Sequence, residues 1–475
     1  MTIEHAIDYI YASYLKAEPH MDYNAPDSEK RNPAFSRQII EKRAGLPTLL
    51  VTGSKGKGSV SKMIAEIMGV HCKVGLMTSP HILKFNERIQ VQGEPVSDTV
   101  LAEAIAAVKP EFDAVEQTLS EKEYISPMGI QAAVALEIFR AYDVDLQVME
   151  CGKGVAYDDV NNVPHKYAVI NHIFQEHTRE LGESLEEIAE NKAAIITGDQ
   201  AAVFTSEQSP EVMAVLRARA EACRTPLYQY GRDFWCEDVR YTEQGMRFDV
   251  VTAKHRYVDL QIPLLGTYQA ENCALAVALC EMAVKDLEAT EPGRLSRAVT
   301  GNPRRTVLGA AEQAQSDILD EAKLKYALKF LEWPGRLEVL SAEPLMLLDA
   351  CINRASCANV LEALEQLQTG KVTTIIGIPL DKDYPGVAEA MASVSEHIIL
   401  TKSQNAHYKF GTEQVDALAE ASMKADWADD VESAIRLTRE YMAAEEAWDR
   451  PIVILGTTSL ISDVKLLAAT PEVLL

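Results

Sequence analysis

A turn rich in glycine and lysine is the first stretch whose residue types could do chemistry. Residues 53–59 read GSKGKGS and directly follow the apolar residues 49–51. Glycines permit positive φ and let backbone N–H groups approach an anion, and a following helix adds the positive end of its dipole. Lys57 can then reach terminal phosphates, and Ser59 can contact Mg²⁺ or a phosphate oxygen. The turn favours phosphate binding over a solvated glycine-rich turn, although its spacing departs from G-x-x-x-x-G-K-[ST] and Gly58 separates the lysine from the serine.

A second candidate is Glu150, which ends the apolar run DLQVME. Ligands of parallel sheets bind at the carboxyl ends of the strands. Mg²⁺ is a hard ion that prefers oxygen ligands. Glu150 can therefore serve Mg²⁺, and the alternative is a strand-end carboxylate in water.

The elements that must position these residues follow from the alternation of apolar runs with amphipathic stretches. The runs LPTLLVTG, DLQVMECG, YAVINHI and AAVFT are typical of strands, and SVSKMIAEIMGV, MGIQAAVALEIFRAY and SLEEIAENKAAII have helical spacing. Strands that are apolar on both faces and alternate with helices predict a parallel α/β sheet. A second alternating set includes LEVLSAEPLMLLDA, ANVLEALEQL, VTTIIGIPLDKD, HIILTKS and IVILGTTSL.

The chain is too long for one ordinary core, with 475 residues. The proline and the glycine of WPGR, residues 333–336, indicate a domain junction. We predict a first domain at 1–334, with a small antiparallel patch near 223–265 and a polar insertion near 287–321. Residues 335–475 are predicted to form a second, smaller α/β domain.

Composition excludes several classes of partner. The formal net charge of -25 repels the phosphate backbone of a nucleic acid, so we expect no nucleic-acid partner. The N-terminal residues do not have the pattern of a signal peptide, and no apolar run is long enough to span a bilayer. The eight cysteines are scattered without a C-x-x-C pair, as expected for thiols in a reducing compartment. We expect a cytoplasmic protein with no membrane partner.

Eight motifs in series carry a resemblance to a known family. With GSKGKGS they are TSPHILKFNERIQVQGEPV, MECGKGVAYDDVNNV, EHTRELGESLEEIAENKAAII, GTYQAENCALAVAL, WPGRLEVL, GIPLDKDY and VILGTTSLISDV. In this order, over nearly the whole chain, they resemble the folylpolyglutamate synthase and dihydrofolate synthase family of the Mur ligase superfamily. The resemblance implies a P-loop-type parallel-sheet ATPase domain followed by a smaller Rossmann-like domain. It also implies a mostly monomeric ligase that uses ATP to join an amino acid to a carboxylate through an acyl phosphate.

The resemblance also implies site residues. Those for Mg²⁺ are Ser59, Ser79, Glu150 and His177. Those for ATP are Gly53, Ser54, Lys55, Gly56, Lys57, Gly58, Ser59, Val60, Asn272, Arg336 and Asp349. Catalytic roles fall on Lys57, Lys192, Arg336 and Asp349.

Four of these assignments have a specific meaning in the family. By resemblance Lys192 is carbamylated, Asn272 lies near the adenine, Arg336 reaches the terminal phosphate from the junction, and Asp349 faces the nucleotide. The alternatives from the residues alone are a salt-bridged helix lysine, a helix-cap asparagine, a linker arginine and a strand-end aspartate.

The chain departs from the family pattern at four places. Lys55 replaces an asparagine in the phosphate loop, Ile352 replaces the histidine of D-G-A-H-N, and YISPMG replaces an aromatic–acidic pair at Ile125 and Ser126. In G-x-G-G-R-x-D-x-T-N a glycine, an arginine and a threonine are missing, because these positions are Val155, Ala156 and Val160. An isoleucine cannot donate a hydrogen bond or carry a proton.

The retained metal and phosphate residues favour a working ligase. The first hypothesis is the addition of glutamate to a folate or a folate-like acid. The second is ligation to a different carboxylate, which the substitutions at Ser126, Val155 and Ile352 favour. The third is a nucleotide-binding regulatory protein without turnover.

Overall fold

Apolar side chains on both faces of β1 (Thr48–Thr52) place this strand inside a layered domain. The computed structural model describes residues 1–22, 25–242, 244–290, 318–405 and 408–468. Leu49 and Val51 point into one apolar cluster and Leu50 into another. Helices therefore cover both faces of the sheet, as predicted for a parallel α/β domain.

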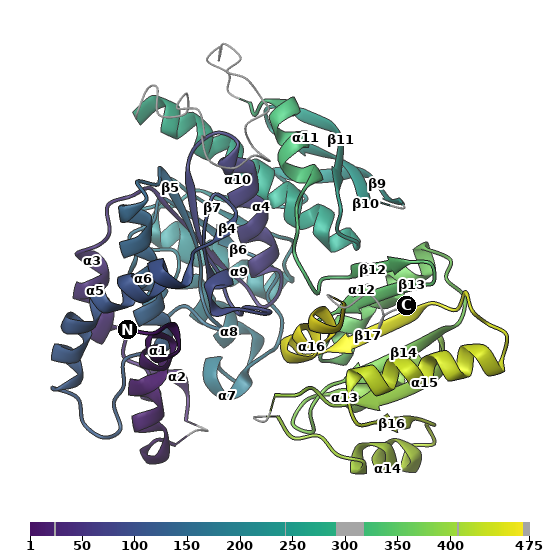
Figure 1. The fold of residues 1–475 in the computed structure, drawn as a ribbon. Helices are drawn as coiled ribbons and strands as arrows, with labels where there is room; N and C mark the ends of the chain where they lie inside the picture. The colour runs from purple at the N-terminus through teal and green to yellow at the C-terminus, as the bar shows by residue number, and fades with distance from the viewer. Residues whose placement is uncertain (23–24, 243, 291–317, 406–407, 469–475) are drawn as a thin grey trace.

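The first sheet has eight strands in the order β4-β3-β2-β5-β1-β6-β7-β8. Of these, β4, β5, β6 and β7 are labelled in Figure 1. β1 pairs in parallel with β5 on one side and with β6 on the other. The strands besides β1 are β2 (Val74–Met77), β3 (Ile89–Val91), β4 (Glu94–Pro95), β5 (Leu146–Glu150), β6 (Tyr167–Ile170), β7 (Ala202–Thr205) and β8 (Leu227–Gln229). The segments predicted as strands in this half are confirmed, whereas β2 to β4 were not predicted.

Two layers of helices enclose this sheet. The layer on the side of Leu49 contains α4 (Lys57–Gly69), α10 (Thr267–Thr290) and α11 (Glu321–Lys329). The opposite layer contains α1 (Ile3–Ala17), α3 (Ala34–Glu41), α5 (Asp98–Glu116), α6 (Pro127–Ala141), α8 (Leu185–Ala193) and α9 (Pro210–Cys223). The short helices α2 (Asp27–Lys30) and α7 (Thr178–Leu181) lie at its lower edge in Figure 1.

A three-stranded antiparallel sheet packs against α10. Its order is β11-β10-β9, with β9 (Phe234–Thr242), β10 (Gly245–Thr252) and β11 (Arg256–Ile262). These strands fall inside the stretch 223–265, whose first residues belong to the end of α9 and to β8. Most of the predicted insertion near 287–321 lies outside the described residues, since α10 extends to Thr290 and the description resumes at 318.

The second sheet has six strands in the order β12-β13-β17-β14-β15-β16, and only β12 is antiparallel to its neighbour. Its strands are β12 (Glu338–Ala342), β13 (Leu345–Asp349), β14 (Val372–Gly377), β15 (Ser395–Thr401), β16 (Asp426–Ala428) and β17 (Ile452–Gly456). Its helices are α12 (Arg354–Gln366), α13 (Tyr384–Ala392), α14 (Glu413–Glu420), α15 (Val431–Ala444) and α16 (Thr458–Ala468). The two-sheet architecture confirms the predicted fold class, and we propose the boundary at 334–335 because the second sheet begins just after it.

In the described part of the chain, no helix is long and apolar enough to cross a membrane.

Candidate active site

The phosphate loop joins β1 to α4 through a left-handed turn at Gly56, whose φ is +74°. A Cβ at Gly56 would lie 2.3 Å from Nδ2 of Asn171, so only glycine fits this close approach. Asn171 follows β6 and donates to Oδ1 of Asn272 at 2.8 Å. The loop is thus built on two buried amides, and Lys57 at the first turn of α4 donates to the carbonyl of Gly53 at 3.0 Å.

Asn272 lies under the loop, where it also donates to Gln269 at 3.1 Å. Its proximity to the adenine stays a prediction. Val60 has a fully buried side chain in the core and a backbone N–H that donates to the carbonyl of Gly56 at 2.9 Å. Any contribution of Val60 to ATP binding is therefore through the shape of the loop.

Glu150 ends β5 beside the phosphate loop, at the carboxyl edge where it was expected. Its Oε2 accepts from the hydroxyl of Thr78 and from the backbone N–H of Ser79, the latter at 3.1 Å. Burial raises the pKa of Glu150, and the charges of Lys57 and Arg336 oppose that shift. A buried carboxylate facing cations is suited to hold a divalent ion.

The other predicted metal ligands come from different elements around the same cleft. Ser59 is buried in the first turn of α4, and Ser79 follows β2. His177 precedes α7 with φ +47°, and its side chain is 46% exposed. Partial desolvation lowers its pKa, which favours the neutral form that binds metals. Among the described residues, no group of three or more His, Cys, Asp or Glu could hold a metal ion. A bound Mg²⁺ would therefore need hydroxyl, phosphate or water oxygens besides Glu150 and His177.

Lys192 lies on α8 with a side chain that is 0% exposed. Its Nζ donates to the carbonyls of Gly53 at 3.0 Å and Lys153 at 2.7 Å, and to Oε1 of Glu176 at 3.2 Å. Burial, together with the nearby charge of Lys57, lowers the pKa of Lys192 to about 8. The lysine therefore ties the phosphate loop to the segment that carries His177.

Arg336 and Asp349 come from the second half of the chain. Asp349 ends β13, and its Oδ2 accepts from the N–H of Leu337 at 2.9 Å. Burial raises the pKa of Asp349, and the charges of Arg336 and Lys55 oppose that shift. Ile352 follows Asp349 in the half-buried loop before α12, where the family histidine would stand.

One cleft of about 1500 Å³ joins most of these residues. The predicted site residues that line it are Ser54, Lys55, Gly56, Lys57, Gly58, Ser59, Ser79, Glu150, His177, Asn272, Arg336 and Asp349. Gly53, Val60 and Lys192 do not line the cleft but support its wall. The structure thus gathers phosphate, metal and second-sheet residues around one space.

Sequence reasoning missed Thr78, Asn171 and Glu176, which contact the site directly. Asn171 follows β6 as Glu150 ends β5, so the strand-end rule that found Glu150 would have found it. Thr78 stands next to the predicted Ser79, and Glu176 next to the predicted His177.

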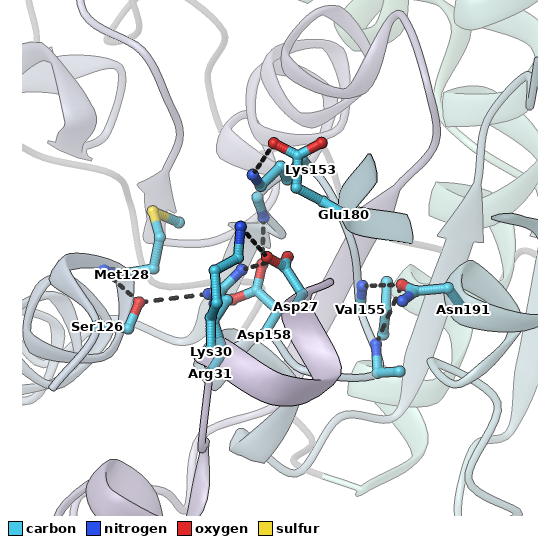
Figure 2. Close-up of polar contacts among 12 residues, drawn as sticks. Asp27, Lys30, Arg31, Ser126, Met128, Lys153, Val155, Asp158, Glu180 and Asn191 are labelled. Atoms are coloured by element: carbon cyan, nitrogen blue, oxygen red, sulfur yellow. Dashed lines mark hydrogen bonds and ion pairs between the residues drawn. The ribbon is translucent and has the colours of Figure 1, made fainter. Parts of the chain in front are cut away.

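The divergent segment 152–161 packs against residues of the N-terminal segment (Figure 2). The guanidinium of Arg31 lies 3.8 Å from Asp158 and 3.6 Å from Asp159 and donates to Ser126 at 3.3 Å. Burial raises the pKa of Asp159 to about 6, and Arg31 opposes that rise. Arg31 and Asp158 both line a second polar cavity of about 750 Å³.

Val155 and Ala156 occupy positions where the family has glycine and arginine. The side chain of Val155 is fully buried in the apolar core, and its N–H donates to Oδ1 of Asn191 at 2.9 Å (Figure 2). Ala156 also donates its N–H to Asn191. Nearby, Lys153 lines the catalytic cleft and pairs with Glu180 at 3.0 Å.

Comparisons with known proteins agree with this arrangement. The family model of the Mur ligase middle domain matches residues 51–280, and that of the Mur ligase glutamate ligase domain matches residues 335–456. The chain is 28% identical to folylpolyglutamate synthase of Lacticaseibacillus casei over 87% of this chain and 88% of that protein. It is 28% identical to dihydrofolate synthase/folylpolyglutamate synthase of Bacillus subtilis over 87% of this chain and 89% of that protein.

Among solved structures, the FPGS–AMPPCP–folate complex superimposes with a TM-score of 0.75 at 25% identity, over 98% of this chain and 99% of that chain. The two domain matches follow one another along the chain in the order of the two sheets. The chain belongs to the folylpolyglutamate synthase family of Mur ligases and is an ATP-dependent carbon–nitrogen ligase.

Proposed function

We propose that this ligase adds glutamate to a folate-type carboxylate acceptor. The observation that carries the proposal is the single cleft in which the phosphate loop and Glu150 face Arg336 and Asp349 from the second sheet. A two-sided cleft suits a reaction that must bring three substrates together. The relatives named above support glutamate and folate as the substrates.

The first step transfers the γ-phosphoryl group of ATP to the acceptor carboxylate and releases ADP. Different residues of the cleft bind the phosphates and the metal ion in this step. The N–H groups of the phosphate loop and the ammonium of Lys57 hold the phosphates. Glu150, His177, Ser59 and Ser79 would hold Mg²⁺, and the carboxylate and hydroxyl oxygens among them are the ligands that this ion prefers. When bound, the ion neutralises negative charge on the phosphates.

In the second step, the amine of glutamate attacks the carbonyl carbon of the acyl phosphate, and the collapsing tetrahedral intermediate expels phosphate. Arg336 lines the cleft from the junction between the sheets, so its guanidinium can stabilise charge on the phosphate as it leaves. Asp349 lies within electrostatic reach of Arg336 and lines the same cleft. We assign both residues to catalysis on this basis.

Carbamylation of Lys192 remains a prediction from the family. A pKa of about 8 leaves about a quarter of the amine neutral at pH 7.5, and the neutral amine is the form that reacts with CO₂. The three oxygen acceptors around Nζ nevertheless match the three donors of an ammonium. A carbamate would bring two further acceptor oxygens among them, so these surroundings suit the unmodified ammonium.

The identity of the acceptor depends on the divergent segment. Arg31 contacts Ser126 and Asp158 where the family motif is altered, and Arg31 and Asp158 line the second cavity. This observation keeps a non-folate carboxylate as the second candidate acceptor. We further propose that the ligase is a cytoplasmic monomer acting on small molecules.

The test is phosphate release from Mg-ATP with glutamate and dihydrofolate, tetrahydrofolate or no acceptor. Release that needs both folate and glutamate, with a product heavier by one glutamyl unit, supports the proposal. If phosphate release depends on glutamate but occurs only with carboxylic acids other than folates, the acceptor is the second candidate, a non-folate carboxylate. Nucleotide binding without release under any of these conditions refutes ligation and leaves a regulatory protein.

A further inference from the structure

Lys55 makes a hydrogen bond from the phosphate loop to the second half of the chain. Its Nζ donates to Oγ of Ser356, which lies 301 positions later, in the first turn of α12. The hydroxyl of Ser356 in turn donates to Oδ1 of Asn353 at 2.6 Å. Asn353 caps α12 by accepting from the N–H of Ser356 at 2.9 Å. A continuous chain of donors therefore runs from the phosphate loop into the cap of α12.

The surroundings of Lys55 are unusual for a lysine. Burial lowers its pKa, and in the described part of the chain it has no carboxylate within ion-pair distance. Asp349 acts on it only through electrostatic attraction, and Arg336 repels it. Burying an ammonium costs stability when its hydrogen-bond partner is a neutral hydroxyl and not a carboxylate. Folding therefore does not account for a lysine here.

The position of Ser356 gives this contact a consequence for the site. Ser356 and Asp349 both line the catalytic cleft, and the segment between them connects β13 to α12. The hydrogen bond thus fixes the face of the second domain that carries Asp349 relative to the loop that carries Lys57. Movement of that face away from the loop breaks the bond.

We propose that Lys55 is a positioning residue that couples the phosphate loop to the second domain through Ser356 and so holds the cleft closed during amide formation. Lys55 contacts the reacting groups only indirectly, whereas Lys57 and the loop N–H groups hold the phosphates. Loss of Lys55 therefore lowers the turnover number more than the affinity for ATP. This inference rests on the proposed ligase function.

The experiment compares Lys55→Ala, Lys55→Arg, Ser356→Ala and the double variant Lys55→Ala/Ser356→Ala. Lys402→Ala, at a half-exposed lysine of the second domain, is the matched control. We expect Lys55→Ala to lower kcat for ligation about tenfold or more and to change KM for ATP less than about threefold. Lys55→Arg, which can still donate to the hydroxyl, retains kcat within about threefold.

The double-variant cycle tests the partner. If Lys55 acts through Ser356, then Ser356→Ala lowers kcat like Lys55→Ala, and the double variant is no slower than Lys55→Ala. A wild-type rate for Ser356→Ala beside a slow Lys55→Ala, or multiplied effects in the double variant, would overturn the proposal. A wild-type rate for Lys55→Ala, or a rise in KM for ATP as large as the fall in kcat, would overturn it as well.

A readout without turnover separates this inference from the proposed function. Small-angle X-ray scattering with Mg-AMPPCP reports the arrangement of the two domains whatever the acceptor is. We expect Lys55→Ala and Ser356→Ala to give a larger radius of gyration than the wild type and Lys402→Ala. Equal radii would overturn the coupling, whereas a ligase inactive with folates but with the expected radii would contradict only the acceptor.

Discussion

Replacement of Glu150 by glutamine removes one negative charge from the site while preserving its hydrogen bonds. Both donors to this side chain, the hydroxyl of Thr78 and the N–H of Ser79, reach the same oxygen, Oε2. A glutamine can place its carbonyl oxygen there and its NH₂ group at the position of Oε1. The variant therefore tests the charge of Glu150 separately from its shape.

The effects on stability and on activity are expected to differ greatly. Because burial raises the folded-state pKa of Glu150, the wild type loses stability as pH rises from the unfolded value of 4.5 through the folded value. Glutamine removes this loss, so at neutral pH Glu150→Gln is expected to be as stable as the wild type within about 1 kcal/mol. Turnover is expected to fall about 10²- to 10³-fold, since a charged group that serves the phosphoryl transfer is lost.

The assay is phosphate release as a function of Mg²⁺ concentration, with thermal melting of the same samples. Thr78→Val is the matched control, because it removes a donor to Glu150 but keeps the charge; we expect a loss of about tenfold or less. A higher Mg²⁺ requirement for Glu150→Gln than for Thr78→Val would support the metal role. Near-wild-type turnover of Glu150→Gln at low Mg²⁺ would refute the assignment.

Three further variants probe other parts of the molecule. Lys57→Ala should lower ATP turnover at least about 100-fold with an unchanged melting temperature, and a fully active variant would contradict the phosphate role of the loop. Gly56→Ala places a methyl group against Asn171 in a left-handed turn and should weaken AMPPCP binding about tenfold or more, as calorimetry can measure; unchanged affinity would contradict the described turn. His71 is buried, has no hydrogen-bond partner for either ring nitrogen in the described residues, and has a pKa lowered by burial from 6.5 to about 4. As pH falls from 6.5 to 4, the unfolded chain binds the His71 proton first, so this residue should lower the free energy of unfolding by about 3 kcal/mol. His71→Leu should therefore lose less stability over this range in melting curves than the wild type. An identical pH dependence of the two proteins would contradict the prediction.

The part of the site that could be predicted comes from single elements of the chain. Glu150 was found because it ends an apolar run, and the phosphate loop because glycines follow another. Both features depend on local sequence and on the rule that ligands gather at the carboxyl edge of a parallel sheet. The fold class could be predicted in the same way, because alternating apolar strands and amphipathic helices can pack in only a few layered architectures.

The contacts that could not be predicted join segments far apart in the sequence. From the residues alone, Lys192 is a lysine salt-bridged within its own helix, yet its ammonium is fully buried against Glu176 and two carbonyls from other segments. Nothing in its helix identifies those acceptors, because they come from three different loops. The partner of Lys55 was hidden for the same reason.

The altered motif at 152–161 has a physical explanation that sequence comparison with the family does not provide. Ala156 carries no charge where the family has an arginine, but a guanidinium still reaches Asp158 and Asp159, because Arg31 enters from the N-terminal segment. Without Arg31, two buried carboxylates would lie close together without a cation between them, an arrangement that costs several kcal/mol. Arg31 therefore supplies beside Asp158 and Asp159 the positive charge that Ala156 lacks. Lys57, Glu150 and Arg336 meanwhile line the catalytic cleft, so the altered segment leaves the residues assigned to the ligase chemistry in place.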